Sequence, residues 1–322
     1  MKAAVYYDVG GPEVLRYEEV SDPVCRSDGV VIDVRAVSLE GGDLLHRAGG
    51  ELTSRPHVVG YQCAGRIREV GTAVSDRKVG DPVVAVMPHG SHAERAAVQA
   101  AATWVVPEGL GLERAATVPI PFGTADDCLF EFGHLQAGER VLIQAGAGGV
   151  GLAAIQLARR AGARVAATAS SAAKLARLKT LGVECTIQYR EQDLVAAVRE
   201  WTEGRGVDLV VDSVGGRTLE KSIDAARYRG RIISVGRAGR DALPADTSAL
   251  MPGNKTLTGV FFGAELMLAR ERVHPMVQAH LEAIARGELQ AILDRSFALS
   301  DAAAAHAYVE SRRALGRVLL IP

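Results

Sequence analysis

The stretch Leu142–Gly162, LIQAGAGGVGLAAIQLARRAG, joins an apolar segment to an amphipathic one through a run of glycines. The apolar start predicts a buried strand, and apolar residues at helical spacing after Gly151 predict a helix. Four glycines fall within the six residues that separate the two elements. Because glycine weakens regular structure, this junction requires a backbone without side chains.

The glycines fit the pattern G-x-G-x-x-G in a strand–turn–helix setting. Such glycines allow a tight turn, close approach of the backbone to a pyrophosphate, and close packing of helix on strand. The amides at the start of the following helix would then face the diphosphate. A merely flexible loop in an alanine-rich segment is the alternative. We expect a dinucleotide site formed by Gly146, Gly148, Gly149, Val150 and Gly151.

The pattern of predicted elements changes near residue 120. Before it, short β-branched runs such as VVIDVRAVS and DPVVAVMP are separated by Gly, Pro and Asp, as in a β-rich domain. After it, apolar strands alternate with helical stretches, which predicts a parallel, doubly wound sheet. The closing GRVLLIP reads as a strand that returns to the β-rich part. We therefore predict an α/β protein with a discontinuous domain, 1–120 and 264–322, around a nucleotide domain, 121–263.

Composition limits the possible partners. The 322 residues carry a formal net charge of −1, which gives no general attraction to nucleic acid or to an anionic membrane. No apolar run approaches the length of a membrane span, and no signal peptide is evident. The four cysteines are widely spaced and form no CxxC pair, which favours a reducing compartment. We expect a cytoplasmic protein with a small-molecule partner.

The region beyond the glycines selects the dinucleotide. An NAD site usually carries an acid about 20 residues after the glycines, to bind the ribose hydroxyls. No acid occurs between Val165 and Leu178, whereas Ser170, Ser171 and Lys174 offer hydroxyls and a cation. These groups match a 2′-phosphate, so NADPH is predicted. A solvated helix residue is the alternative for Lys174.

Several segments resemble the zinc-independent quinone oxidoreductase branch of the medium-chain dehydrogenase/reductase superfamily. They are the opening MKAAVYYDVGGPEVL, AVSLEGGDLLHRAG, the glycine segment, VDLVVDSVGG, GRIISVG, and the closing AHAYVESRRALGRVLLIP. The resemblance implies a GroES-like β-rich catalytic domain, a Rossmann nucleotide domain and a homodimer. It also implies 2′-phosphate contacts from Ser170, Lys174 and Tyr189, and we expect a further cofactor contact from Arg317.

The resemblance also bears on metal binding. Zinc-dependent relatives take ligands from a Cys in C-x-x-D and from a G-H-E triplet. Here Glu40 occupies the Cys place, and Gly60-Tyr61-Gln62 stands in place of G-H-E. His89 and His92 could form a metal pair, but a turn before a strand is the better interpretation without a third ligand. We predict no metal.

The candidate catalytic residues are Glu40, His46 and Tyr61. Glu40 stands where quinone reductases usually carry an active-site Asn. Its carboxylate would bind a substrate hydroxyl or relay a proton; a solvated loop acid in an altered pocket is the alternative, and the same alternative holds for His46 and Tyr61. We predict hydride transfer from NADPH to a quinone or α,β-unsaturated carbonyl without zinc. A reductase of an enoyl thioester or biosynthetic intermediate, and a non-catalytic NADPH-binding protein, are the alternatives.

Overall fold

The computed structural model describes residues 1–322, which form two compact units. One unit contains Met1–Ile120 and Ala269–Pro322, and the other contains Pro121–Leu268. The second crossing between units lies five residues beyond the position predicted from sequence. The difference is helix α8 (Phe262–Leu268): the buried Phe262 ring packs on Gly123, where a Cβ would meet the ring at 2.2 Å. This contact holds α8 in the nucleotide unit.

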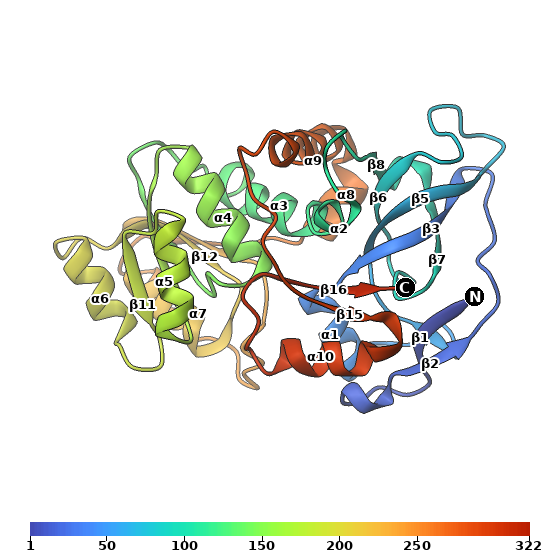
Figure 1. The fold of residues 1–322 in the computed structure, drawn as a ribbon. Helices are drawn as coiled ribbons and strands as arrows, with labels where there is room; N and C mark the ends of the chain where they lie inside the picture. Colours follow the sequence, from blue (N-terminus) through green and yellow to red (C-terminus); the bar gives the residue numbers. More distant parts are fainter. The chain divides into compact units, whose positions relative to one another are not determined.

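The unit Pro121–Leu268 contains a six-stranded sheet in which every strand pair is parallel (Figure 1). Its strand order is β11-β10-β9-β12-β13-β14. The strands are β9 (Arg140–Ile143), β10 (Arg164–Ala169), β11 (Cys185–Gln188), β12 (Val207–Asp212), β13 (Ala226–Ser234) and β14 (Thr256–Gly259). The helices that follow them are α4 (Gly149–Arg160), α5 (Ala172–Thr180), α6 (Leu194–Trp201) and α7 (Gly216–Ala225). The predicted doubly wound sheet is confirmed.

The order of the strands identifies where a ligand would bind. The chain proceeds from β9 through β10 to β11, then crosses to β12 on the other side of β9. In open α/β sheets, ligands bind at the carboxyl ends of the strands on either side of such a reversal. Val141, Leu142 and Ile143 in β9 are each fully buried, as expected for a central strand covered on both faces. The glycine turn leaves the carboxyl end of this strand.

The other unit is β-rich. Its larger sheet contains β3 (Gly29–Ser38), β5 (Gln62–Val70), β6 (Pro82–Val86), β7 (Arg95–Gln99), β8 (Thr103–Val105), β15 (Leu293–Ala298) and β16 (Arg317–Ile321). A smaller sheet contains β1 (Lys2–Tyr6), β2 (Arg16–Glu19) and β4 (His57–Val58). The helices are α1 (Gly41–Gly49), α2 (Leu112–Ala115), α9 (Arg270–Ala285) and α10 (Ala302–Glu310), while α3 (Pro119–Asp126) begins here and continues into the nucleotide unit.

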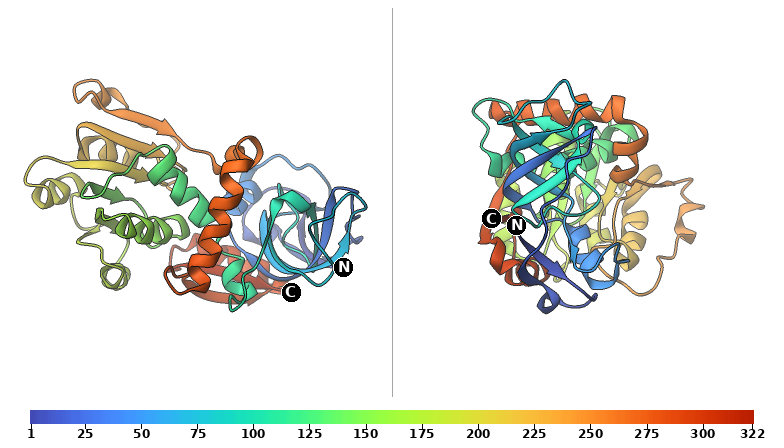
Figure 2. Two further views of the ribbon diagram at one scale, coloured as in Figure 1. Left: turned by 90° about the horizontal axis from the view of Figure 1, so that it is seen from above. Right: turned by 90° about the vertical axis from the view of Figure 1, so that its right-hand side faces the viewer.

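Two contacts close this unit with residues from the end of the chain. Strand β16 pairs antiparallel with β3, Leu319 opposite Ser38, so the closing strand returns to the β-rich part as predicted. Helix α9 lies against β8 (Figure 2), where the Trp104 indole donates to His274 O at 3.0 Å. No helix in either unit combines the length and the apolar composition needed to cross a membrane.

Candidate functional site

The glycine turn between β9 and α4 is held in a defined conformation by backbone hydrogen bonds. Ala145 has φ +50°, a left-handed conformation that is uncommon outside glycine. The amide of Gly146 donates to Thr168 O at 2.8 Å, and the amide of Gly148 donates to Ala145 O at 2.9 Å. The turn is therefore tied to β10 and to itself.

Two of the glycines are required by the space around them. A Cβ on Gly151 would lie 2.5 Å from Ala145 O, and one on Gly146 would lie 2.9 Å from the Leu178 side chain. At the start of α4, the Leu152 amide donates to Gly148 O at 2.9 Å. The amides that precede it have no intrahelical acceptor, as in the first turn of any helix. This bare, amide-lined helix start fits a pyrophosphate.

The ends of β10 and β11 bring the predicted 2′-phosphate residues near one another. Ser170 follows β10, and Lys174 lies in the first turn of α5, whose N-cap Ser171 accepts from the Lys174 amide at 3.5 Å. The Tyr189 amide, just after β11, donates to Ala169 O at 3.4 Å. The Arg190 guanidinium lies over the Tyr189 ring, 6.0 Å from its centroid. Hydroxyls and cations are the groups that bind a phosphate.

In the other unit, Glu40 lies in a buried hydrogen-bonded cluster rather than in solvent. Its Oε1 accepts from Ser38 Oγ at 2.9 Å and from Gln62 Nε2 at 3.1 Å, and it forms an ion pair with Arg317. Glu40 is 3% exposed. Arg317 Nη2 also donates to Ser38 Oγ at 2.8 Å and to Leu39 O at 2.6 Å. The cluster thus links β3, the start of α1, β5 and β16.

Two more ionisable side chains border this cluster. The carboxyl of Asp43 is fully buried; its Oδ2 accepts from the Glu40 amide at 2.8 Å, and its Oδ1 has no hydrogen-bond partner. Burial raises the pKa of Asp43 well above its usual value, and burial raises that of Glu40 against the opposing charge of Arg317. Burial and the neighbouring carboxyls raise the pKa of Tyr61 well above its usual value, and its hydroxyl lies against Gly42, where a Cβ would meet it at 2.7 Å. Tyr61 therefore keeps its phenolic proton.

His46, in α1, belongs to a different cluster, which it forms with Tyr6 and His57. Its Nδ1 lies 2.7 Å from Tyr6 Oη, and its ring stacks on His57 with 4.9 Å between centroids. The His89 ring lies 5.1 Å from that of His57. His57 is fully buried with an unpartnered Nε2, and burial lowers its pKa to about 4. None of these contacts of His46 involves Glu40 or the side chains bonded to it, so His46 and Glu40 belong to separate clusters.

The two histidines of HGSH do not face each other. His89 lies beside His57, whereas His92 Nε2 lies 3.2 Å from His306 Nε2. The chain contains no group of three His, Cys, Asp or Glu side chains arranged to hold a metal ion.

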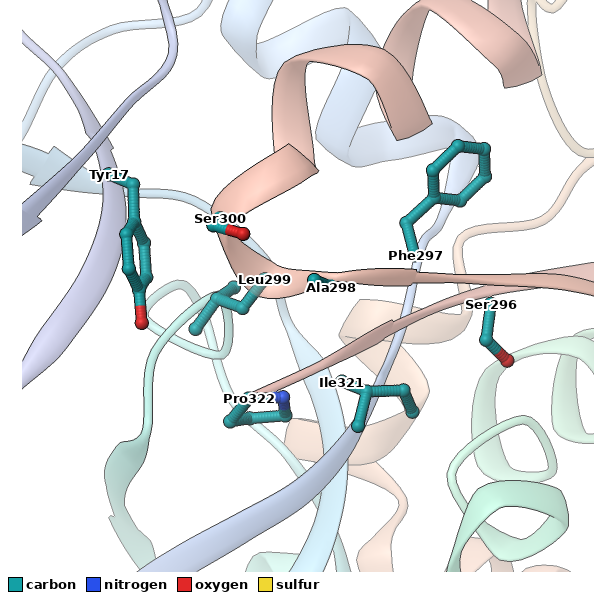
Figure 3. Close-up of a pocket in the computed structure, with 8 residues that line it drawn as sticks. All are labelled: Tyr17, Ser296, Phe297, Ala298, Leu299, Ser300, Ile321 and Pro322. Atoms are coloured by element: carbon teal, nitrogen blue, oxygen red, sulfur yellow. The ribbon is translucent and has the colours of Figure 1, made fainter.

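A pocket of about 470 Å³ in the β-rich unit is separate from all of the predicted site residues (Figure 3). It lies beside the edge strand β15 and the end of β16. Its walls come from Tyr17, Ser296, Phe297, Ala298, Leu299, Ser300, Ile321 and Pro322.

Sequence reasoning missed the partners that hold the site together. Gln62 links the Glu40 cluster to the backbone of residues 116–120. Its Nε2 also donates to Ala116 O at 2.6 Å, and its Oε1 accepts from the Ile120 amide at 2.7 Å. Asp43 and Ser38 were likewise not identified. Gln62 and Ser38 are polar residues next to apolar strand residues, and such buried polar groups need partners; that was the available signal.

The fold and these two groups of residues define a class: a dehydrogenase with a GroES-like domain and a Rossmann nucleotide domain. Family models agree, with the alcohol dehydrogenase GroES-like domain matching residues 26–119 and the zinc-binding dehydrogenase domain matching residues 149–282. At the places of the zinc ligands named above, this chain carries Glu40 for the Cys and Gly60-Tyr61-Gln62 for the G-H-E triplet.

Individual relatives narrow the class. The chain is 32% identical to a Burkholderia 2-haloacrylate reductase, over 99% of this chain and 98% of that protein, and 32% identical to a Pseudomonas aeruginosa quinone oxidoreductase, over 97% of each. The crystal structure of Escherichia coli quinone oxidoreductase complexed with NADPH superposes with a TM-score of 0.95 at 29% identity, covering 100% of both chains. The chain belongs to the quinone oxidoreductase-like branch of the medium-chain dehydrogenase/reductase superfamily.

Proposed function

We propose that this protein is an NADPH-dependent oxidoreductase that delivers hydride to a quinone or an α,β-unsaturated carbonyl compound without zinc. The observation that carries the proposal is the glycine turn followed, at the end of β10, by hydroxyls and a cation instead of an acid. The NADPH in the E. coli quinone oxidoreductase structure supports the same cofactor here. Gly146–Gly151 would hold the pyrophosphate, and Ser170, Lys174 and Tyr189 the 2′-phosphate.

When bound, NADPH supplies the hydride; the protein orients it and excludes water. The acceptor oxygen gains negative charge and needs a hydrogen-bond donor. Tyr61 suits this role because its raised pKa keeps the phenolic proton on the oxygen, where it can be donated. Glu40 would keep Arg317 in place, and the wider roles of Glu40, His46 and Arg317 toward substrate and cofactor stay predictions.

An acceptor screen tests the reaction. With purified protein and NADPH, we expect steady loss of absorbance at the reduced nicotinamide band with small quinones or enones. Turnover with enoyl thioesters but not with quinones would favour the alternative reductase. Tight NADPH binding without turnover on any acceptor would instead favour a non-catalytic binding protein. The relation to 2-haloacrylate reductase, whose name denotes an α,β-unsaturated acid, makes haloacrylates a necessary part of the screen.

We also infer a homodimer in the cytoplasm. Strand β14 is an unpaired edge of the nucleotide sheet, and Phe261 beside it is 73% exposed, an aromatic that a second copy would cover. All four cysteines are free, which suits a reducing compartment. Light scattering should give a dimer for the wild type and a monomer for Phe261→Glu, while Val24→Glu, at an exposed position of the other unit, serves as a control. A wild-type monomer would contradict the inference.

A further inference from the structure

A chain of four buried polar side chains runs beneath the glycine turn. Thr168 in β10, Gln144 after β9, Ser222 in α7 and Asp212 at the end of β12 are each at most 2% exposed. Thr168 Oγ1 donates to Gln144 Oε1 at 2.9 Å, Gln144 Nε2 donates to Ser222 Oγ at 2.9 Å, and Ser222 Oγ donates to Asp212 Oδ2 at 2.6 Å. Each of these hydrogen bonds is donated in the direction of Asp212, so the series of side chains ends on one carboxylate.

Each end of this hydrogen-bonded series of side chains binds the backbone of a turn. At one end, Thr168 Oγ1 accepts from the amide of Ala145 at 3.0 Å, the residue with left-handed backbone that precedes Gly146. At the other end, Asp212 Oδ1 accepts from the amides of Val214 and Gly215, each at 2.8 Å. Gly215 has φ +75° and opens α7. Unusual backbone conformations persist only when surrounding contacts hold them.

The two turns stand on either side of the reversal in strand order. One follows β9 and the other follows β12, and these strands are neighbours in the sheet. A dinucleotide at this position would meet both turns. We propose that Thr168, Gln144, Ser222 and Asp212 are positioning residues that fix the two turns relative to each other, and that this spacing sets the affinity for the pyrophosphate and nicotinamide part of NADPH.

The inference rests on NADPH as the cofactor, and its test is binding without an acceptor. In Ser222→Ala, Gln144 Nε2 and Asp212 Oδ2 each lose a buried partner. We expect the Kd for NADPH to rise about tenfold, because unsatisfied buried groups release the turns. Ser222→Thr keeps the hydroxyl and should bind within about threefold of the wild type. Gln144→Met, which removes both hydrogen bonds at similar length, provides a second variant should Ser222→Ala fail to fold.

Two comparisons separate positioning from general loss of stability. Thr202, at the end of α6, has a buried hydroxyl that donates to Val198 O at 2.7 Å and accepts from the Gly206 amide at 2.8 Å. Thr202→Val should lower Tm without raising the Kd for NADPH. The probe 2′-AMP carries the 2′-phosphate but no 5′-phosphate, so it would bind at the Ser170–Lys174 end without the glycine turn, and its Kd should change less than threefold in Ser222→Ala.

The outcomes are distinct. Equal losses for NADPH and 2′-AMP, or an NADPH loss in Thr202→Val that matches Ser222→Ala, would overturn the inference. A wild type that binds no NADPH would instead overturn the proposed function. A selective loss of NADPH affinity in Ser222→Ala, restored in Ser222→Thr, would establish the positioning role.

Discussion

Lys174 is the residue on which the choice of dinucleotide depends most. It lies in the first turn of α5, beside the end of a strand that carries no acid. Lys174→Ala should raise the Kd for NADPH about 10- to 100-fold, the worth of a charge-assisted hydrogen bond, while the Kd for NADH changes little. Fluorescence titration measures both. Lys179→Ala, in the last turn of the same helix, is the matched control.

Tyr61 can be tested at the same scale. Tyr61→Phe removes only the hydroxyl that we assign to the acceptor oxygen. It should lower kcat about 10- to 100-fold while the Kd for NADPH is preserved, because the lost hydrogen bond forms to charge that develops in the transition state. Steady-state kinetics on the acceptor found in the screen provide the measurement. An unchanged kcat would remove Tyr61 from the catalytic residues.

At the scale of elements, the Glu40–Arg317 ion pair fastens β16 to the start of α1. Each of Glu40→Gln and Arg317→Gln should lower the free energy of unfolding by about 3 kcal/mol, because each leaves a buried charge or donor unpaired. The double variant should lose less than the sum. The exposed Asp33 is the control: it pairs with Arg68 at 3.6 Å and with Arg95 at 3.5 Å, and Asp33→Asn should still cost less than about 1 kcal/mol.

The same variants address the role of Glu40 in catalysis. If its carboxylate faces the substrate, Glu40→Gln will change kcat more than the Kd for NADPH. A kcat equal to that of the wild type, with a lower stability, would make Glu40 a structural partner of Arg317 alone. Stopped-flow measurement of NADPH binding, beside steady-state turnover, distinguishes the two results.

How far the sequence predicts these elements depends on whether the signal is local. The glycine turn, the βα alternation and the returning strand Arg317–Ile321 are visible because periodicity and turn residues lie within short windows. The partners Glu40 and Arg317 lie 277 residues apart, and no local pattern pairs them. The polar chain beneath the turn was missed for the same reason, although Gln144 directly follows one apolar strand and Asp212 ends another. A polar residue at the carboxyl end of a buried strand is the signal to seek.

At the scale of the whole molecule, buried neutral histidines link stability to pH. Arg47 Nη1 lies 3.4 Å from His306 Nδ1; because arginine only donates, this nitrogen accepts, and the proton on His306 Nε2 faces His92 at 3.2 Å. Burial lowers the pKa of His92 to about 3, and burial with the neighbouring Arg47 and His92 lowers that of His306 well below its usual value. Neither imidazole can take up a proton without losing this arrangement.

The direction in which the free energy of unfolding changes with pH follows from proton uptake. As the pH falls below about 6.5, an unfolded histidine binds a proton that the folded one does not. Each such histidine therefore lowers the free energy of unfolding by about 1.4 kcal/mol per pH unit as the pH falls through this range. His306→Gln, whose amide oxygen can still accept from Arg47, should make the decline shallower by about one proton. Denaturation at several pH values, followed by the buried Trp104 in a Trp201→Phe background, measures the slope. Parallel declines in the two proteins would show that His306 does not carry this dependence.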